Sequence, residues 1–195
     1  PVGPVYRKII LVPFAERIPY SETFRFLIEP LKWNVGIGMW GIGKDTVVYS
    51  VPLRNGHSAR FSSVICYESV YPDFVRQFVK RGAQFLVIIT NDSWWGNTSG
   101  AYQHVSYASL RAVENRRWIV RAANGGISGF IDPTGRIHDE TKLYDTATIH
   151  GTIESRGDMT FYALHGDVFA VLCVAGTAIL LLIALLPQRK TSELL

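Results

Sequence analysis

The stretch that decides the fold is Ser63-Val-Ile-Cys-Tyr-Glu-Ser-Val-Tyr-Pro72. Just before Cys66, residues 59–65 carry the apolar and β-branched side chains of a short buried strand, and this pattern stops at the cysteine. Beyond it, apolar side chains recur at helical spacing, at Val70, Phe74, Val75, Phe78 and Val79. The pattern therefore predicts a strand followed directly by a helix, with Cys66 at the turn between them.

Cys66 would lie at the carboxyl end of its strand, where a side chain is exposed. The positive end of the following helix dipole would favour a reactive thiolate at this place. A buried cysteine more often serves as a small apolar side chain. The polar neighbours Tyr67 and Glu68 favour the nucleophile, because a core would require apolar residues at those positions.

Further short elements are predicted along the chain. Strands are expected at residues 9–12, 47–51, 84–90, 118–123, 127–131 and 147–153, and helices at residues 21–31 and 102–116. Turns are expected at residues 55–56, 124–126 and 132–135. Strands that alternate with helices indicate an α/β architecture. The glycine-rich, Trp-containing segment 33–43 is either a surface loop or a loop that contacts lipid or an acyl chain.

Composition points to a membrane and not to a nucleic acid. The chain has 195 residues, of which 48% are hydrophobic and 18% charged, and its net charge is +4. This length suffices for one domain with a core, and no Lys/Arg block with interleaved aromatics predicts nucleic-acid binding. Residues 168–186 carry no charge and would extend roughly 28 Å as a helix, enough to cross a bilayer core. Arg189 and Lys190 follow them and predict a cytoplasmic carboxyl end.

Four motifs in one order carry a resemblance to a known family. Cys66-Tyr67-Glu68, followed by Tyr71-Pro72, resembles the nucleophile turn of the carbon–nitrogen hydrolase (nitrilase) superfamily. The other motifs are Tyr6-Arg-Lys-Ile-Ile-Leu-Val-Pro-Phe-Ala-Glu16, Asn91-Asp-Ser-Trp-Trp-Gly96 with Gln103-His104, and Arg111-Ala-Val-Glu-Asn-Arg116 leading to Asn124-Gly-Gly126. Together with the apolar segment behind them, they are similar to the apolipoprotein N-acyltransferase family, from about residue 5 to the chain end.

The resemblance implies an incomplete, nitrilase-like four-layer αββα sandwich followed by one carboxyl-terminal transmembrane helix. Residues 1–160 would form the hydrolase-like domain without its amino-terminal part. Residues 161–187 would be the transmembrane segment with its lead-in, and residues 188–195 a cytoplasmic tail. The chain starts at Pro1 and the motif around Lys8 follows at once, so a fragment of a longer protein is expected.

The resemblance also implies acyl transfer through a thioester. Cys66 would attack the ester carbonyl of a phospholipid, and the N-terminal amine of an apolipoprotein would then take the acyl chain. Lys8, which could otherwise be a solvated flank of its strand, matches the family's catalytic lysine. Glu16 matches a glutamate that positions it, although Ala15 stands where the family has glycine. Lys8 and the backbone N–H of Tyr67 would stabilise the oxyanion.

Four further side chains are expected to bind or position substrate: Tyr67, Glu68, Trp94 and Trp95. A single tryptophan usually belongs to the core, but these two lie between polar residues and Gly96, after a predicted strand.

No cofactor or metal is expected. His104 lacks a second ligand at metal spacing and is interpreted as a packing or hydrogen-bonding side chain. A disulfide between Cys66 and Cys173 is not expected, because Cys173 lies inside the apolar terminal segment.

The family's triad consists of Glu, Lys and Cys, with the general-base glutamate upstream of the lysine. None of the seven residues before Lys8 is acidic, so this chain alone is expected to be inactive or nearly so. The resemblance places it in the bacterial inner membrane, with its globular domain on the periplasmic or outer face. Two other functions stay open: a superfamily amidase or nitrilase that hydrolyses a C–N bond, which the apolar terminal segment disfavours, and a non-enzymatic, membrane-anchored remnant.

Overall fold

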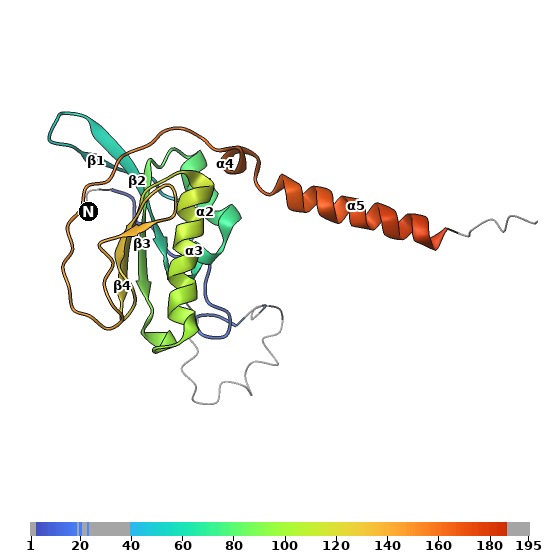
Figure 1. Ribbon diagram of the computed structural model, residues 1–195, viewed down its shortest axis with the longest axis horizontal. Coiled ribbons are helices and arrows are strands. Elements are labelled where there is room, and N and C mark those ends of the chain that lie inside the picture. The colour runs from blue at the N-terminus through green and yellow to red at the C-terminus, as the bar shows by residue number, and fades with distance from the viewer. Residues whose placement is uncertain (1–2, 19, 21–22, 24–39, 187–195) are drawn as a thin grey trace, which may run out of the picture.

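The computed structural model describes residues 3–18, 20, 23 and 40–186 of the protein (Figure 1). The helix predicted at residues 21–31 and most of the segment 33–43 lie outside the described residues, as do Arg189 and Lys190. Those predictions therefore stay predictions.

The fold is built on a six-stranded mixed sheet with the strand order β1-β2-β3-β4-β5-β6. Its strands are β1 (Tyr49–Pro52), β2 (Ser58–Ile65), β3 (Phe85–Asn91), β4 (Ile119–Asn124), β5 (Gly129–Ile131) and β6 (Ile137–His138). The neighbours β2, β3 and β4 pair in parallel, and the other pairs are antiparallel. The α/β class is thus confirmed, and five of the predicted strands lie within a few residues of their predicted positions.

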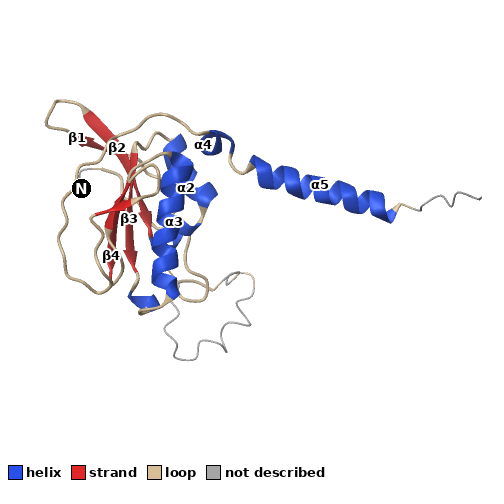
Figure 2. Cartoon of the chain, in the orientation of Figure 1, coloured by secondary structure: helices blue, strands red, loops and turns tan. Residues whose placement is uncertain are grey.

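Two helices connect the parallel strands, α2 (Pro72–Lys80) between β2 and β3, and α3 (Ser99–Asn115) between β3 and β4. Crossovers between parallel strands are almost always right-handed. Because both crossovers step in the same direction along the sheet, they place both helices on the same face (Figure 2).

The core lies between that face and the two helices. Side chains of the three parallel strands alternate, so every second residue points at the helices. The buried apolar residues of this core on the sheet are Val64, Leu86, Ile88, Ile119 and Ile131, and those on the two helices are Val75, Phe78, Val79, Ala108 and Ala112. Apolar burial of this kind stabilises by about 25 cal/mol per Å², so this layer fixes the carboxyl ends of β2, β3 and β4 relative to one another.

The opposite face of the sheet is only partly covered. The rings of Tyr49, Phe61 and Phe85 stack across β1, β2 and β3 with centroids 5.2 and 5.3 Å apart. Ile89 on this face is 51% exposed. The described residues hold one sheet, so the second sheet of the expected sandwich does not appear among them.

Two predicted strands are wrong. Residues 9–12 form an apolar run and residues 147–153 a mixed apolar and polar one, but neither segment joins the sheet in the described structure. The backbone N–H groups of Ile9 and Ile10 donate to a carboxylate and that of Val12 to a second one, so they are not available for a strand ladder. Residues 147–153 run without ladder partners, and a Cβ added to Gly151 would come within 2.7 Å of the ring of Phe130.

The carboxyl-terminal part leaves the domain as two helices, α4 (Phe161–His165) and α5 (Val168–Leu185). α4 contacts α2, where Arg76 Nη1 donates to the carbonyl oxygen of Ala163. α5 has 18 residues with a mean hydropathy of 2.9, none of them buried, and projects away from the domain (Figure 1). By length and composition it is the single described helix able to cross a membrane.

Candidate active site

Cys66 lies where β2 ends, as predicted, but the element that follows is not the predicted helix. A 3₁₀ helix, η2 (Cys66–Val70), comes first, and α2 begins only at Pro72. The dipole of α2 therefore does not begin at the cysteine. Instead, Cys66 has a left-handed backbone with φ of 52°. This conformation costs an L-residue about 1–2 kcal/mol, so the surrounding contacts must hold it, as is common at functional turns.

Glu68 is the first of these contacts. Its carboxylate is completely buried and accepts four hydrogen bonds. One comes from the backbone N–H of Ile65, just before the cysteine, at 2.8 Å. Two come from the N–H groups of Ile9 and Ile10, at 2.6 and 3.2 Å. Tyr6 completes the set through its hydroxyl at 2.7 Å. Glu68 therefore fastens the segment that carries Lys8 to the turn that carries Cys66.

Burial is the main reason why the pKa of the Tyr6 hydroxyl is raised far above its usual value, and the neighbouring charge and hydrogen bond of Glu68 add to it. The phenol accordingly stays protonated and serves as a permanent donor to Glu68. Glu68 was expected to bind or position substrate. Its carboxylate is directed into the protein by its four partners, so any positioning of substrate by Glu68 acts through the backbone.

Lys8 and Glu16, both expected at the site, form an ion pair. Lys8 Nζ lies 2.8 Å from Oε1 and 2.7 Å from Oε2 of Glu16. Oε2 also accepts from the backbone N–H of Val12 at 2.8 Å. The turn through Ala15 closes with a hydrogen bond from the N–H of Glu16 to the carbonyl of Val12 at 2.9 Å. Alanine in place of glycine therefore leaves the carboxylate in reach of the lysine.

Trp94 and Trp95 follow β3 in a 3₁₀ turn, η3 (Ser93–Trp95). Trp94 is 82% exposed and Trp95 46%, so neither belongs to the core. The ring of Trp95 lies against the first turn of α3, where a Cβ added to Gly100 would come within 2.5 Å of it. Tyr67 forms an edge-to-face contact with Tyr71, with ring centroids 5.2 Å apart. Contact of these aromatic side chains with substrate stays a prediction.

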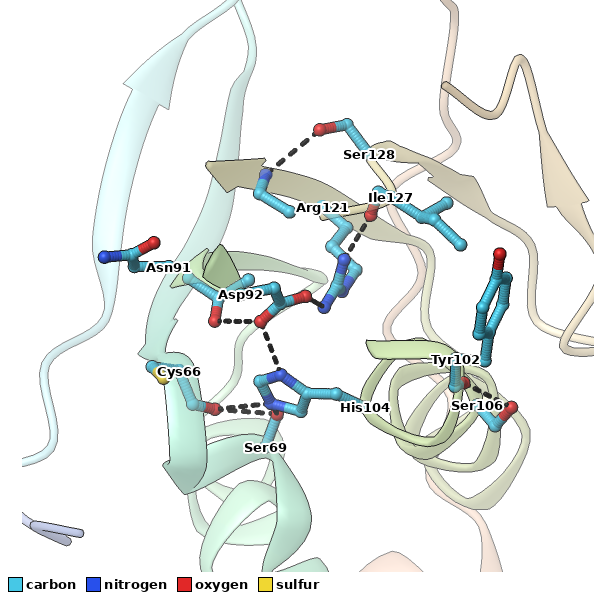
Figure 3. Close-up of polar contacts among 12 residues, drawn as sticks. Cys66, Ser69, Asn91, Asp92, Tyr102, His104, Ser106, Arg121, Ile127 and Ser128 are labelled. Atoms are coloured by element: carbon cyan, nitrogen blue, oxygen red, sulfur yellow. Dashed lines mark hydrogen bonds and ion pairs between the residues drawn. The ribbon is translucent and has the colours of Figure 1, made fainter. Parts of the chain in front are cut away.

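A buried polar network next to the turn was not predicted. Its members Asp92, His104, Arg121 and Ser69 come from the end of β3, from α3, from β4 and from η2 (Figure 3). The hydrogen-bonding role expected for His104 is confirmed, since both ring nitrogens have partners. The described residues include no cluster of three or more side chains suited to hold a metal.

A glycine allows this network to close. A Cβ at Gly126 would lie 2.4 Å from Oδ2 of Asp92, so only glycine lets the predicted turn at residues 124–126 approach the carboxylate. The polar residues after the apolar strand 85–91 were a signal for function in the sequence. No pattern in the sequence indicated the contact between Asp92 and Arg121, because an arginine inside a strand usually points to solvent.

Cys66, Asp92 and the turn at residues 124–126 all follow the carboxyl ends of adjacent parallel strands. In open α/β sheets, sites form at this edge. The arrangement defines a protein with a cysteine-bearing strand–turn–helix unit and a lysine–glutamate pair. A family model described as "Carbon-nitrogen hydrolase" matches residues 2–157, and the chain belongs to this family.

Curated relatives narrow the resemblance. The chain is 40% identical over 190 residues to the apolipoprotein N-acyltransferase of Chlorobaculum tepidum, covering 96% of this chain and 36% of that protein. It is 40% identical over 185 residues to the protein of the same name from Geobacter metallireducens, covering 95% and 33%. The chain thus spans about a third of the length of these relatives. Among solved structures, an amidase of the nitrilase superfamily from Nesterenkonia sp. AN1 is 20% identical, with a TM-score of 0.47 over 71% of this chain and 46% of the amidase.

Proposed function

We propose that the chain carries the acyl-transfer site of an apolipoprotein N-acyltransferase, which moves a fatty acyl chain from a phospholipid to the N-terminal amine of an apolipoprotein. The observation that carries this proposal is the Glu68 contact. It joins the backbone beside Lys8 to the backbone beside Cys66, so the segments that carry a cation and a candidate nucleophile are bound to the same carboxylate. The name shared by the curated relatives supplies the substrate class.

In the first step, Cys66 Sγ attacks the ester carbonyl carbon of the phospholipid. A C–S bond forms, the ester C–O bond breaks, and the lysophospholipid leaves with a proton on its oxygen. The oxyanion that forms between these events is stabilised by the Tyr67 N–H and by the Lys8 ammonium. Glu16 holds this ammonium in place through its two short contacts.

In the second step, the amine of the acceptor attacks the thioester carbonyl. A C–N bond forms, the C–S bond breaks, and the Cys66 thiol is regenerated. The amine, once it loses a proton, is a better nucleophile toward a thioester than water at equal concentration, so a site that holds the amine and excludes water yields transfer and not hydrolysis.

The surroundings of the site fit lipid substrates. The exposed Trp94 and the half-exposed Trp95 would contact the donor acyl chain, since aromatic rings of this kind favour the membrane interface. α5 would anchor the chain in the bacterial inner membrane, with residues 1–160 on its outer face and residues 188–195 in the cytoplasm. These segment bounds are the ones expected from the sequence.

The test follows both steps in detergent. Phospholipid with an isotope-labelled acyl chain is mixed with the protein, and then a peptide whose N-terminal cysteine carries a diacylglyceryl group is added. The proposal predicts slow formation of labelled thioester on Cys66 and at most one equivalent of labelled amide on the peptide per chain, in line with the low activity expected from the sequence. The variants Cys66→Ala and Lys8→Met should give neither product. Release of free labelled fatty acid without amide would instead indicate a hydrolase and contradict the proposal.

A further inference from the structure

The polar network beside the turn runs without interruption from β4 to the backbone of Cys66. Arg121 Nη2 lies 2.6 Å from Oδ2 of Asp92, and His104 Nδ1 lies 2.7 Å from Oδ1. The other ring nitrogen, Nε2 of His104, lies 3.1 Å from Oγ of Ser69 and 3.3 Å from the carbonyl oxygen of Cys66. Arg121, Asp92 and His104 are between 0% and 4% exposed.

The protons of this network follow from the charge of Asp92. Burial by itself would raise the pKa of this carboxyl, but hydrogen bonds and charge from His104 and Arg121 outweigh it and lower the pKa to about 2. Asp92 is therefore a carboxylate and accepts a hydrogen bond from the N–H at Nδ1 of His104. The Ser69 hydroxyl lies 2.8 Å from the Cys66 oxygen and donates to it. Nε2 of the ring, 3.3 Å from the same oxygen, donates to it in the form that carries a proton on both nitrogens, so that the ring and the hydroxyl together hold the carbonyl oxygen in place.

Figure 3 shows that the Cys66 carbonyl points at His104, whereas its sulfur points to the other side. His104 thus contacts the backbone and not the thiol, which rules it out as the direct proton acceptor of Cys66 in this geometry. The carbonyl oxygen of Cys66 and the N–H of Tyr67 belong to one planar peptide group and point in opposite directions in its trans form. Whatever fixes the Cys66 oxygen on one side therefore aims the Tyr67 N–H on the other.

We propose that His104 is a positioning residue: with Ser69 it fixes the peptide plane between Cys66 and Tyr67 and so aims the N–H that stabilises the oxyanion. The inference rests on the proposed function, in which this N–H serves the acyl-transfer step. Asp92 orients the imidazole, and Arg121 neutralises the buried carboxylate. The left-handed Cys66 needs such a clamp, because its backbone conformation is unfavourable by itself.

The test compares two reactions of Cys66 in the full chain, both followed by peptide mapping. Acylation by p-nitrophenyl butyrate passes through an oxyanion, whereas alkylation by iodoacetamide does not. His104→Asn keeps a donor for Asp92 but is too short to reach the Cys66 oxygen. It should lower the saturating acylation rate about 10- to 100-fold, somewhat less than loss of a whole oxyanion donor. The half-saturating ester concentration and the alkylation rate should stay at the wild-type values.

His104→Gln places an amide donor near the position of Nε2 and should recover most of the acylation rate. His138→Asn is the matched control, because His138 also pairs with a carboxylate, Asp132, at 2.8 Å, but on β6. This control should leave both reactions unchanged. A purely structural role would lower both rates of His104→Asn together, or would leave His104→Gln as slow as His104→Asn, and either result would overturn the inference.

The inference is also overturned if His104→Asn reacts with the ester at the wild-type rate, or if wild-type Cys66 takes iodoacetamide but no ester. Failure of the proposed function looks different. A wild-type chain that reacts with p-nitrophenyl butyrate in the way described, but never with phospholipid, contradicts the phospholipid donor and leaves the role of His104 supported.

Discussion

Two buried carboxylates flank the Cys66 turn, and they are satisfied in opposite ways. Glu68 accepts from three backbone N–H groups and a tyrosine hydroxyl. The Asp92 carboxylate instead accepts from three side chains, those of His104 and Arg121 and the hydroxyl of Thr90, which lies 2.9 Å from Oδ1. A carboxylate bound by backbone groups can hold a segment that forms no strand or helix, whereas one bound by side chains connects helices and strands that are already formed. Glu68 therefore fixes the amino-terminal segment at the candidate site, and Asp92 connects the Cys66 turn to the sheet.

The largest expected effect comes from Glu68→Gln. The amide keeps one acceptor oxygen, but its NH₂ group would face donors where the second oxygen now accepts. Since hydrogen bonds to charged groups are worth about 1.5–3 kcal/mol each, losing two should lower the free energy of unfolding by about 3–6 kcal/mol. Urea unfolding in detergent would measure it. Glu154→Gln, at an exposed position, is the control and should have no measurable effect.

Asp92→Asn should have the next largest effect. It leaves the guanidinium of Arg121 buried without its charged partner, and breaking a buried pair in this way costs about 3–5 kcal/mol. Asp158→Asn is a suitable control, because Asp158 is half-exposed and lies 3.8 Å from Arg117. If the two variants lose equal amounts of unfolding free energy, the Asp92 network is not the connection described above.

At acid pH, the free energies of unfolding of the wild type and of Asp92→Asn should become more similar. The pKa of Asp92 is lowered to about 2 in the folded protein, against about 4 in an unfolded chain. Its contribution is therefore complete above pH 4 and is lost as the pH falls from about 4 to 2. A shift of this size corresponds to about 2–3 kcal/mol. Urea titrations at pH 2, 3, 4 and 7 would show it, and a difference that stays constant over this range would contradict the assigned contacts.

Truncation after Asp167 should change stability least. No residue of α5 is buried, so its removal should leave the free energy of unfolding of the domain within about 0.5 kcal/mol. Membrane association should be lost, because α5 is the candidate span. A carbonate wash followed by sedimentation measures this. If the truncated protein still sediments with membranes, another segment anchors it, and residues 33–43 would be the first to examine.

The parts of the molecule that periodicity describes were predictable from the sequence. Alternation and helical spacing locate β2, β3, β4 and α3, and the polar residues that interrupt them at Cys66 mark the edge where the site forms. The segment 9–12 shows where this reasoning stops: an apolar run indicates burial, but it does not say what its N–H groups bind. Here the partner of Ile9 is Glu68, 59 residues away.

The Asp92 network could not be predicted from the sequence, for the same physical reason. Its pairs connect residues that lie 12 and 29 positions apart, and only the parallel pairing of β3 with β4 brings Arg121 next to Asp92. The positive φ of Cys66 was equally invisible, because glycine, not cysteine, usually marks such a conformation. The 3₁₀ turn that results replaced the helix expected directly after the cysteine.

The measurement that tests the central claim most directly is the selectivity of the two cysteines. The protein in lipid vesicles is treated with a lipid-like acyl-phosphonate probe, digested, and mapped by mass spectrometry. Cys66, at the held turn, should be labelled, while Cys173, inside α5 and shielded by lipid, should not. Equal labelling of both cysteines, or labelling of Cys173 alone, would contradict the assignment of Cys66 as the nucleophile.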